Sequence, residues 1–137
     1  MLMSRQLAEY ETYKLTTKEE TVIDEIKSRI FNRLIFPAHW TKEGIAQPNM
    51  ACKEKAFKLC RHIFEIYDRA PDRIAPSKEE GVFIAFDSPT GDKSLFIEVY
   101  NNLEASYIVN DNVQKRILLS DDISEFSFDK AIKYING

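Results

Sequence analysis

The stretch VFIAFDSPTGDKSLFIEVYNNLEASYIVNDNVQKRILL, residues 82–119, decides the fold. It contains four runs rich in β-branched and aromatic residues, at 82–87, 94–100, 104–110 and 113–119, and such runs are typical of strands. The breaks between them are short and hold the usual turn formers Gly, Pro, Asn and Asp. Because short turns join neighbouring antiparallel strands, the stretch predicts a four-stranded antiparallel meander.

The turn between the second and third strands determines which residues share a face. A two-residue turn would place Tyr100 opposite Leu103 and mix apolar with polar side chains, whereas a three-residue turn places Tyr100 opposite Glu104. We favour the three-residue turn, with Asn102 in the left-handed region. One face then holds Leu95, Ile97, Val99, Ala105, Tyr107 and Val109.

The opposite face of the predicted sheet is also apolar. It holds Phe83, Phe96, Tyr100, Ile108 and Leu118. Helices must cover one face, and the other is more apolar than solvent tolerates. Either the remaining helix and the N-terminal segment cover it, which we favour, or a partner subunit does.

Residues 18–35 predict a helix, because their apolar residues recur at helical spacing. Thr17 and Glu20 match a capping box at its start. Pro37 is expected to end it, since the residue before a proline is driven out of the α region. Residues 4–15 show no clear period.

A long connection at 36–49 leads to a second amphipathic helix, which we expect to begin at Pro48 and to run to about Tyr67. Residues 69–81 contain two prolines, so we expect an irregular, extended path. Residues 127–135 predict a short C-terminal amphipathic helix. The 137 residues thus predict a single α+β domain over 1–137: two helices, a four-stranded sheet and a short helix.

The charge is unevenly divided along the chain. Residues 1–80 hold 14 basic and 13 acidic residues, whereas residues 81–137 hold 5 basic and 9 acidic, within a net charge of −3. This balance argues against nucleic acid as a partner, since nucleic-acid modules usually present a basic stripe. No apolar run is long enough to span a membrane.

Two cysteines are the first candidates for chemistry. Cys52 lies in the first turn of the second helix, where the helix dipole lowers a thiol pKa, and His39 precedes it as a candidate base. Both Cys52 and Cys60 lie on the apolar stripe, so we favour a packing role. Eight residues apart on one helix, they cannot form a disulfide, and free thiols predict a cytoplasmic location. Neither a metal site nor a cofactor-binding motif is predicted, because no zinc-ligand spacing and no Gly-rich phosphate loop is present.

Polar residues in the strand region offer two further candidates. The first and third turns lie at the same end of a meander and gather Asp87, Asp92, Asn110, Asp111 and Asn112. A cation or a basic partner would suit them, but we favour a role as turn formers. Glu98 interrupts an apolar strand, and we expect its carboxylate to face solvent rather than to be paired.

The connection containing His39 and Trp40 is the most informative local feature, because long irregular loops in compact domains are commonly functional. A tryptophan there either plugs the core or acts as an interface anchor. We favour the plug.

Three spaced motifs resemble a family. They read Trp40-x-x-x-Gly44-x-x-x-Pro48, Ala75-Pro76-Ser77-x-x-x-Gly81 and Ile97-Glu98-x-Tyr100-Asn101. Over roughly residues 40–110 the chain resembles a loosely defined family of small uncharacterised bacterial proteins. These have a Trp loop, a helix, a Pro-x-x-x-Pro segment and a Gly-led antiparallel sheet. The usual Gly-Gly pair is here Glu80-Gly81, and the aromatic residue that often ends the first strand is displaced to Phe86. The resemblance implies an architecture but no reaction.

These observations favour a non-enzymatic protein-interaction module, of antitoxin-like or immunity-like class, with no catalytic residue and with a basic protein as partner. The expected binding residues are His39, Trp40, Pro76, Ser77, Glu98, Tyr100 and Asn101. The alternative is a small-molecule binder or enzyme with a pocket between the 36–49 and 69–81 loops and the sheet, using Glu98, His39 or Cys52. A homodimer joined through the sheet is compatible with either.

Overall fold

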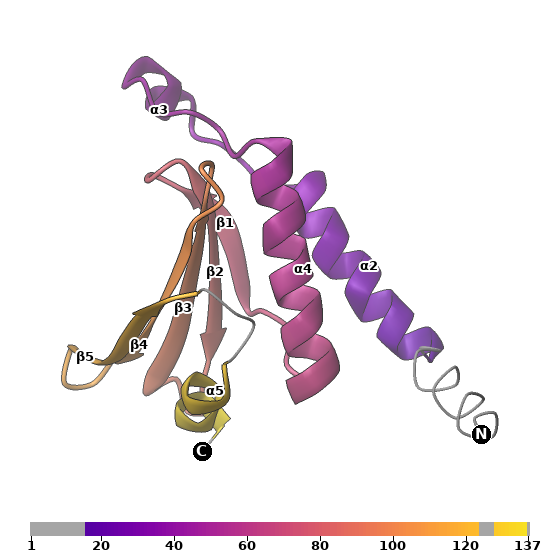
Figure 1. Ribbon diagram of the computed structural model, residues 1–137, viewed down its shortest axis with the longest axis vertical. Helices are drawn as coiled ribbons and strands as arrows, with labels where there is room; N and C mark the ends of the chain where they lie inside the picture. The colour runs from indigo at the N-terminus through magenta and orange to yellow at the C-terminus, as the bar shows by residue number, and fades with distance from the viewer. Residues whose placement is uncertain (1–15, 124–127, 137) are drawn as a thin grey trace.

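The computed structural model describes residues 16–123 and 128–136, and it places one antiparallel sheet against a layer of helices (Figure 1). The helices are α2 (Thr17–Phe31), α3 (Ala38–Lys42), α4 (Met50–Tyr67) and α5 (Asp129–Asn136). The strands are β1 (Arg73–Ser77), β2 (Gly81–Asp87), β3 (Lys93–Tyr100), β4 (Ala105–Asp111) and β5 (Arg116–Asp122). The predicted α+β class is confirmed, and the stretch 4–15 lies outside the described residues.

The strands pair in sequence order, β1-β2-β3-β4-β5, and every pair is antiparallel. The predicted meander is therefore confirmed, but it has five strands rather than four. The missed strand is β1, in the stretch 69–81 that was expected to be irregular. Pro76 is compatible with a strand there because β1 lies at an edge of the sheet, where a missing N–H need not break a ladder.

The last strand begins three residues later than predicted, because residues 112–115 form the turn. Its pairing with β4 contains a register shift, in which Ile117 and Leu119 face consecutive residues of β4. Leu118 is thus the extra residue of a bulge, and it packs against the core. Its predicted place on the opposite face was wrong, since strict alternation does not hold across a bulge.

The predicted register of β3 with β4 is confirmed: Val99 faces Ala105, and the N–H of Tyr100 donates to the carbonyl of Glu104 at 2.8 Å. The left-handed residue of this three-residue turn is Leu103, with φ of 71°, rather than Asn102. Asn102 instead accepts a hydrogen bond from the Glu104 N–H through its side chain. The prediction followed residue preference, whereas the last position of such a turn takes the left-handed conformation.

The helix ends differ by a residue or more from those predicted. The capping box of α2 is formed by Thr16 and Glu19, one residue earlier than predicted, and the helix ends at residue 31, well before Pro37. In α4 the side chain of Asn49 caps the helix, so Pro48 precedes the cap rather than opening the helix. Across residues 16–123 and 128–136, no helix is long and apolar enough to cross a membrane.

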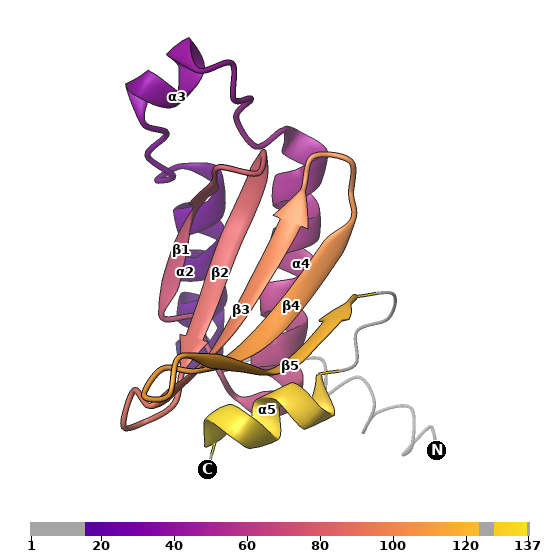
Figure 2. The same ribbon diagram turned by 90° about the vertical axis from the view of Figure 1, so that its left-hand side faces the viewer.

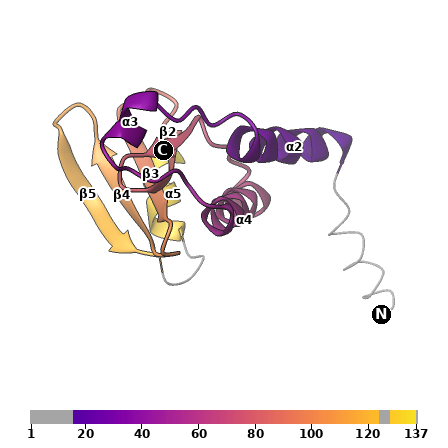
Figure 3. The same ribbon diagram turned by 90° about the horizontal axis from the view of Figure 1, so that it is seen from above.

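The helices α2 and α4 lie on one face of the sheet, with α5 below them against β3 and β4 (Figures 1 and 3). The buried cluster joins side chains from α2, α4, α5 and the inner face of the sheet, including Ile30, Leu59, Ile97 and Ile135. In Figure 2 the other face of the sheet is turned toward the viewer, with α2 and α4 behind the strands. Within the described residues no helix covers that face, so the expected cover by the remaining helix was wrong. The N-terminal segment that was expected to share in the cover lies outside the described residues.

Candidate functional site

The candidate site is the face of the sheet that points away from the helices, which we call the open face. Strand pairing arranges its side chains in three rows across the sheet. The rows are Ser77, Gly81, Tyr100 and Glu104; Ala75, Phe83, Glu98, Ser106 and Asp122; and Arg73, Ala85, Phe96, Ile108 and Ser120. Aromatic and aliphatic side chains thus alternate with polar ones on a surface that remains partly exposed.

An aromatic stack lies at the centre of the open face. The rings of Phe83 and Phe96 are 5.4 Å apart between centroids, and the guanidinium of Arg73 lies 5.6 Å from the centroid of Phe96. Arg73 also donates to the Asp87 carboxylate at 2.8 Å. A guanidinium at this distance from an aromatic ring is a cation–π contact, so Arg73 has both an aromatic and a carboxylate partner.

Two predicted site residues meet on this face. The hydroxyl of Ser77, on edge strand β1, donates to the carboxylate of Glu98, on central strand β3. The same hydroxyl accepts the Glu79 N–H at 3.0 Å. Glu98 is half-buried, so its expected position toward solvent is correct only in part: it faces outward and also has a hydroxyl partner.

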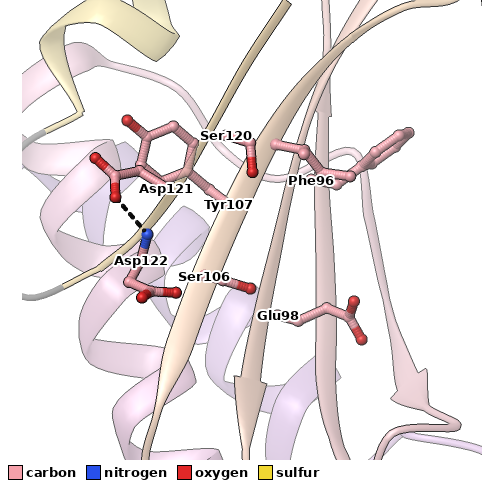
Figure 4. A pocket seen from close by; sticks show the side chains of 8 residues that line it. Phe96, Glu98, Ser106, Tyr107, Ser120, Asp121 and Asp122 are labelled. Carbon is pink, nitrogen blue, oxygen red and sulfur yellow. Dashed lines mark hydrogen bonds between the residues drawn. The ribbon is translucent and has the colours of Figure 1, made fainter. Parts of the chain in front are cut away.

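Tyr100 lies in the adjoining row, and its hydroxyl is 3.1 Å from the Ser106 hydroxyl. Beside it the open face is hollowed into a cavity of about 390 Å³ (Figure 4). Its lining from the open face comprises Phe96, Glu98, Ser106, Ile108, Ser120 and Asp122. Tyr107 and Asp121 also border it, but their side chains alternate to the opposite face of β4 and β5. The lining therefore combines apolar surface with carboxylate and hydroxyl groups.

The charges of the open face are unbalanced. In the part of the chain that the structure describes, Glu98, Glu104 and Asp122 form no ion pair, while Arg73 is paired with Asp87. The open face consequently carries carboxylates whose charge is not neutralised by a cation of the described residues.

The predicted pair His39 and Trp40 lies on α3, which stands beyond the end of the sheet and away from α2 and α4 (Figure 1). The indole packs edge-on against Phe36 at 5.5 Å and against the imidazole of His39 at 6.3 Å. Trp40 is not among the side chains that pack on the core. The favoured role as a core plug is therefore wrong, and α3 is an aromatic arm at the surface.

Pro76 and Asn101 have structural roles near the base of that arm. Pro76 faces Val82 in the β1–β2 pairing. The side chain of Asn101 accepts the Asn49 N–H at 2.8 Å and donates to the Gln47 carbonyl at 2.9 Å. Asn101 thus fastens the segment between α3 and α4 to the β3–β4 turn.

The thiols lie beneath the sheet. The Cys52 thiol is fully buried and lies 3.1 Å from the Val99 carbonyl, and burial raises the pKa of Cys52. Burial also raises the pKa of Cys60, to about 12. The predicted lowering of the Cys52 pKa by the helix dipole is wrong, because desolvation of the thiolate dominates.

We therefore expect neither thiol to react in the folded protein. With 5,5′-dithiobis(2-nitrobenzoate) at pH 8, we expect the native protein to release fewer than about 0.1 equivalents of thionitrobenzoate within minutes. After unfolding in guanidinium we expect two equivalents. The absorbance of the released thiolate measures both. Rapid release of one equivalent from the native protein would contradict the packing role.

The polar turn residues gather at one end of the sheet, as predicted, but bind one another. Asp92 accepts hydrogen bonds from Ser88 and Thr90, and Asn112 donates to the Ser94 hydroxyl at 2.9 Å. The bond from Ser88, with those from Thr90 and Lys93, lowers the pKa of Asp92 to about 2. No group of metal ligands occurs among the described residues, and these contacts fit the favoured role as turn formers.

Some members of the open face were not singled out as binding residues. Arg73 was missed because β1 was not predicted to be a strand, and Asp122 because β5 was predicted to end at residue 119. The chain was compared with family models, curated proteins and solved structures, and none of them matches.

Proposed function

We propose that the chain is a non-enzymatic protein-interaction module and that the open face is its binding surface. The observation that carries the proposal is the one-sided packing of the sheet. The helices α2, α4 and α5 lie on one face, while Phe83, Phe96 and Ile108 remain partly exposed on the other. A contiguous apolar surface with a polar rim is typical of a protein-binding site.

The arrangement of polar side chains supports this proposal over an enzyme. The alternative pocket needs Cys52, His39 and Glu98 to converge, but Cys52 is buried on the helix side of β3 whereas Glu98 points to the open face. His39 lies out on the α3 arm. Acid–base or nucleophilic catalysis requires such groups within hydrogen-bond reach of one another.

The module class includes antitoxin-like and immunity-like proteins, which act by covering the working surface of another protein. Free, buried thiols suit a reducing compartment, so we place the module in the cytoplasm. The proposal includes membership of the family of small uncharacterised bacterial proteins with a Trp loop, a helix and a Gly-led antiparallel sheet. In the proposed interface Glu98 and Tyr100 lie beside the apolar centre, Ser77 holds the Glu98 carboxylate from edge strand β1, and Trp40 is an anchor at the margin.

Two apolar residues of the open face provide the test. We expect the double variant Phe96→Asp/Ile108→Asp to lose at least about tenfold of the partner that copurifies with the wild type from native cells, because it removes the apolar centre of the interface. The matched control is Met50→Asp/Ile66→Asp, since both residues are 60% exposed on α4. Recovery is measured by quantitative mass spectrometry, and circular dichroism confirms that both variants are folded. Equal loss with the control, or retention by the open-face variant, would refute the proposal.

A further inference from the structure

We propose that the partner of the open face is a protein that presents a basic surface, with arginine or lysine side chains set among apolar ones. This inference rests on the proposed function and specifies the chemistry of the partner. It follows from the arrangement of charge on the face.

The middle row of the open face carries two carboxylates that form no ion pair within the described residues, although Glu98 accepts a hydrogen bond from Ser77. Glu98 pairs with Ser106 across β3 and β4, and Ser106 pairs with Asp122 across β4 and β5. The two acidic residues are therefore two strand spacings apart, or about 10 Å. Glu104, the residue before β4, adds a third carboxylate without an ion pair in the adjoining row.

These carboxylates restrict which kinds of partner are able to cover the open face. Any occupant that buries Phe96 and Ile108 also removes water from Glu98 and Asp122, because all four line the same cavity. Removing water from a carboxylate is unfavourable unless a cation or hydrogen-bond donor replaces it. The nearest cation on the face, Arg73, is already held by Asp87 and Phe96. The occupant must therefore bring its own hydrogen-bond donors, and cationic donors fit best because hydrogen bonds between ionised groups are about twice as strong as neutral ones.

The negative charge of the open face also distinguishes between the possible occupants. A second copy docked face to face about a two-fold axis would add its own Glu98, Glu104 and Asp122 to the interface without adding an unpaired cation, and repulsion between these like charges opposes such a contact. Nucleic acid would bring phosphates to the same carboxylates. A basic protein surface satisfies the carboxylates and the apolar row together.

The probe is a random library of 16-residue peptides displayed on phage. The library is panned against the whole chain given by the sequence. We expect the selected peptides to contain at least twice as much Arg and Lys as the unselected library. The variant Glu98→Lys/Asp122→Lys is expected to weaken their binding about tenfold or more, since it turns two attractions into repulsions. The matched control Asp24→Lys/Glu54→Lys, which changes two exposed, unpaired carboxylates on the helices, should leave affinity within about twofold.

Other outcomes distinguish failure of this inference from failure of the proposed function. If binding survives Glu98→Lys/Asp122→Lys but is lost in Phe96→Asp/Ile108→Asp, or if the peptides are not enriched in basic residues, the face is a binding surface but the inference is wrong. If neither double variant affects binding, or no binder is selected, both fail. A dimer of the wild type in sedimentation at low salt that Phe96→Asp/Ile108→Asp dissociates would assign the face to a second copy and overturn the inference.

Discussion

The substitution Gly81→Ala is expected to destabilise the fold by about 4 kcal/mol, at the upper end of single-residue effects. Gly81 opens β2 and faces Tyr100 of β3. A Cβ built there would lie 1.9 Å from the carbonyl oxygen of Val99 and 2.9 Å from the Cα of Tyr100. Both are backbone atoms of a central strand, so they cannot move aside without separating β2 from β3.

Urea unfolding followed by far-ultraviolet circular dichroism measures this loss. The matched control is Gly91→Ala, because no atom lies within 4 Å of its Cβ position and its φ of +76° is the only source of strain. We expect the control to lose about 1 kcal/mol. If the two variants lose the same free energy, the close approach at Gly81 does not determine the stability of the sheet.

The second large effect is expected from Asn101→Ala, at about 2 kcal/mol. The variant removes the two side-chain hydrogen bonds to Gln47 and Asn49, and leaves a backbone donor and a backbone acceptor without their partners. Because these bonds join the base of the α3 arm to the β3–β4 turn, we also expect amides in the segment 43–49 to exchange with solvent about tenfold faster.

Urea unfolding and hydrogen exchange measured by mass spectrometry test both expectations. The control is Asn32→Ala, since the exposed Asn32 side chain forms no hydrogen bond within the described residues. We expect the control to change stability by less than about 0.5 kcal/mol. Unchanged exchange in the segment 43–49 would show that other contacts hold the arm in place.

The parts of the sheet that the sequence predicted well are those governed by alternation. Between β3 and β4, apolar residues occupy every second position on both strands, so a shift of the register by one residue would place Leu95, Ile97 and Val99 beside polar residues of β4. The position of the left-handed residue was not predictable in the same way. Leu103 adopts that conformation because the turn geometry requires it there, against the preference of its branched side chain.

The edge strands were harder to predict than the central ones. β1 was hidden by Pro76, since a proline argues against a central strand but is compatible with an edge. In β5 the bulge at Leu118 breaks the alternation on which the prediction depended. Both errors arise because a sequence pattern does not state whether a strand has one neighbour or two.

Prediction of the candidate site also depended on prediction of β1. Ser77 and Glu98 were each singled out, but their contact spans two strand pairings, and the first of these was not predicted. His39 and Trp40 were singled out as binding residues in an irregular connection. Their position on a projecting arm depends on α3, which is too short to have a clear hydrophobic period.

The sequential order of the strands has a consequence for synthesis of the chain on the ribosome. Each strand after β1 pairs with the strand made immediately before it, so among the described strands only β1 waits for a partner that has not yet been translated. Hairpins of this kind form in microseconds, whereas a residue is added only every ~0.1 s. The sheet can therefore grow one hairpin at a time as the chain emerges, with α2 and α4 already made and available to cover its apolar face.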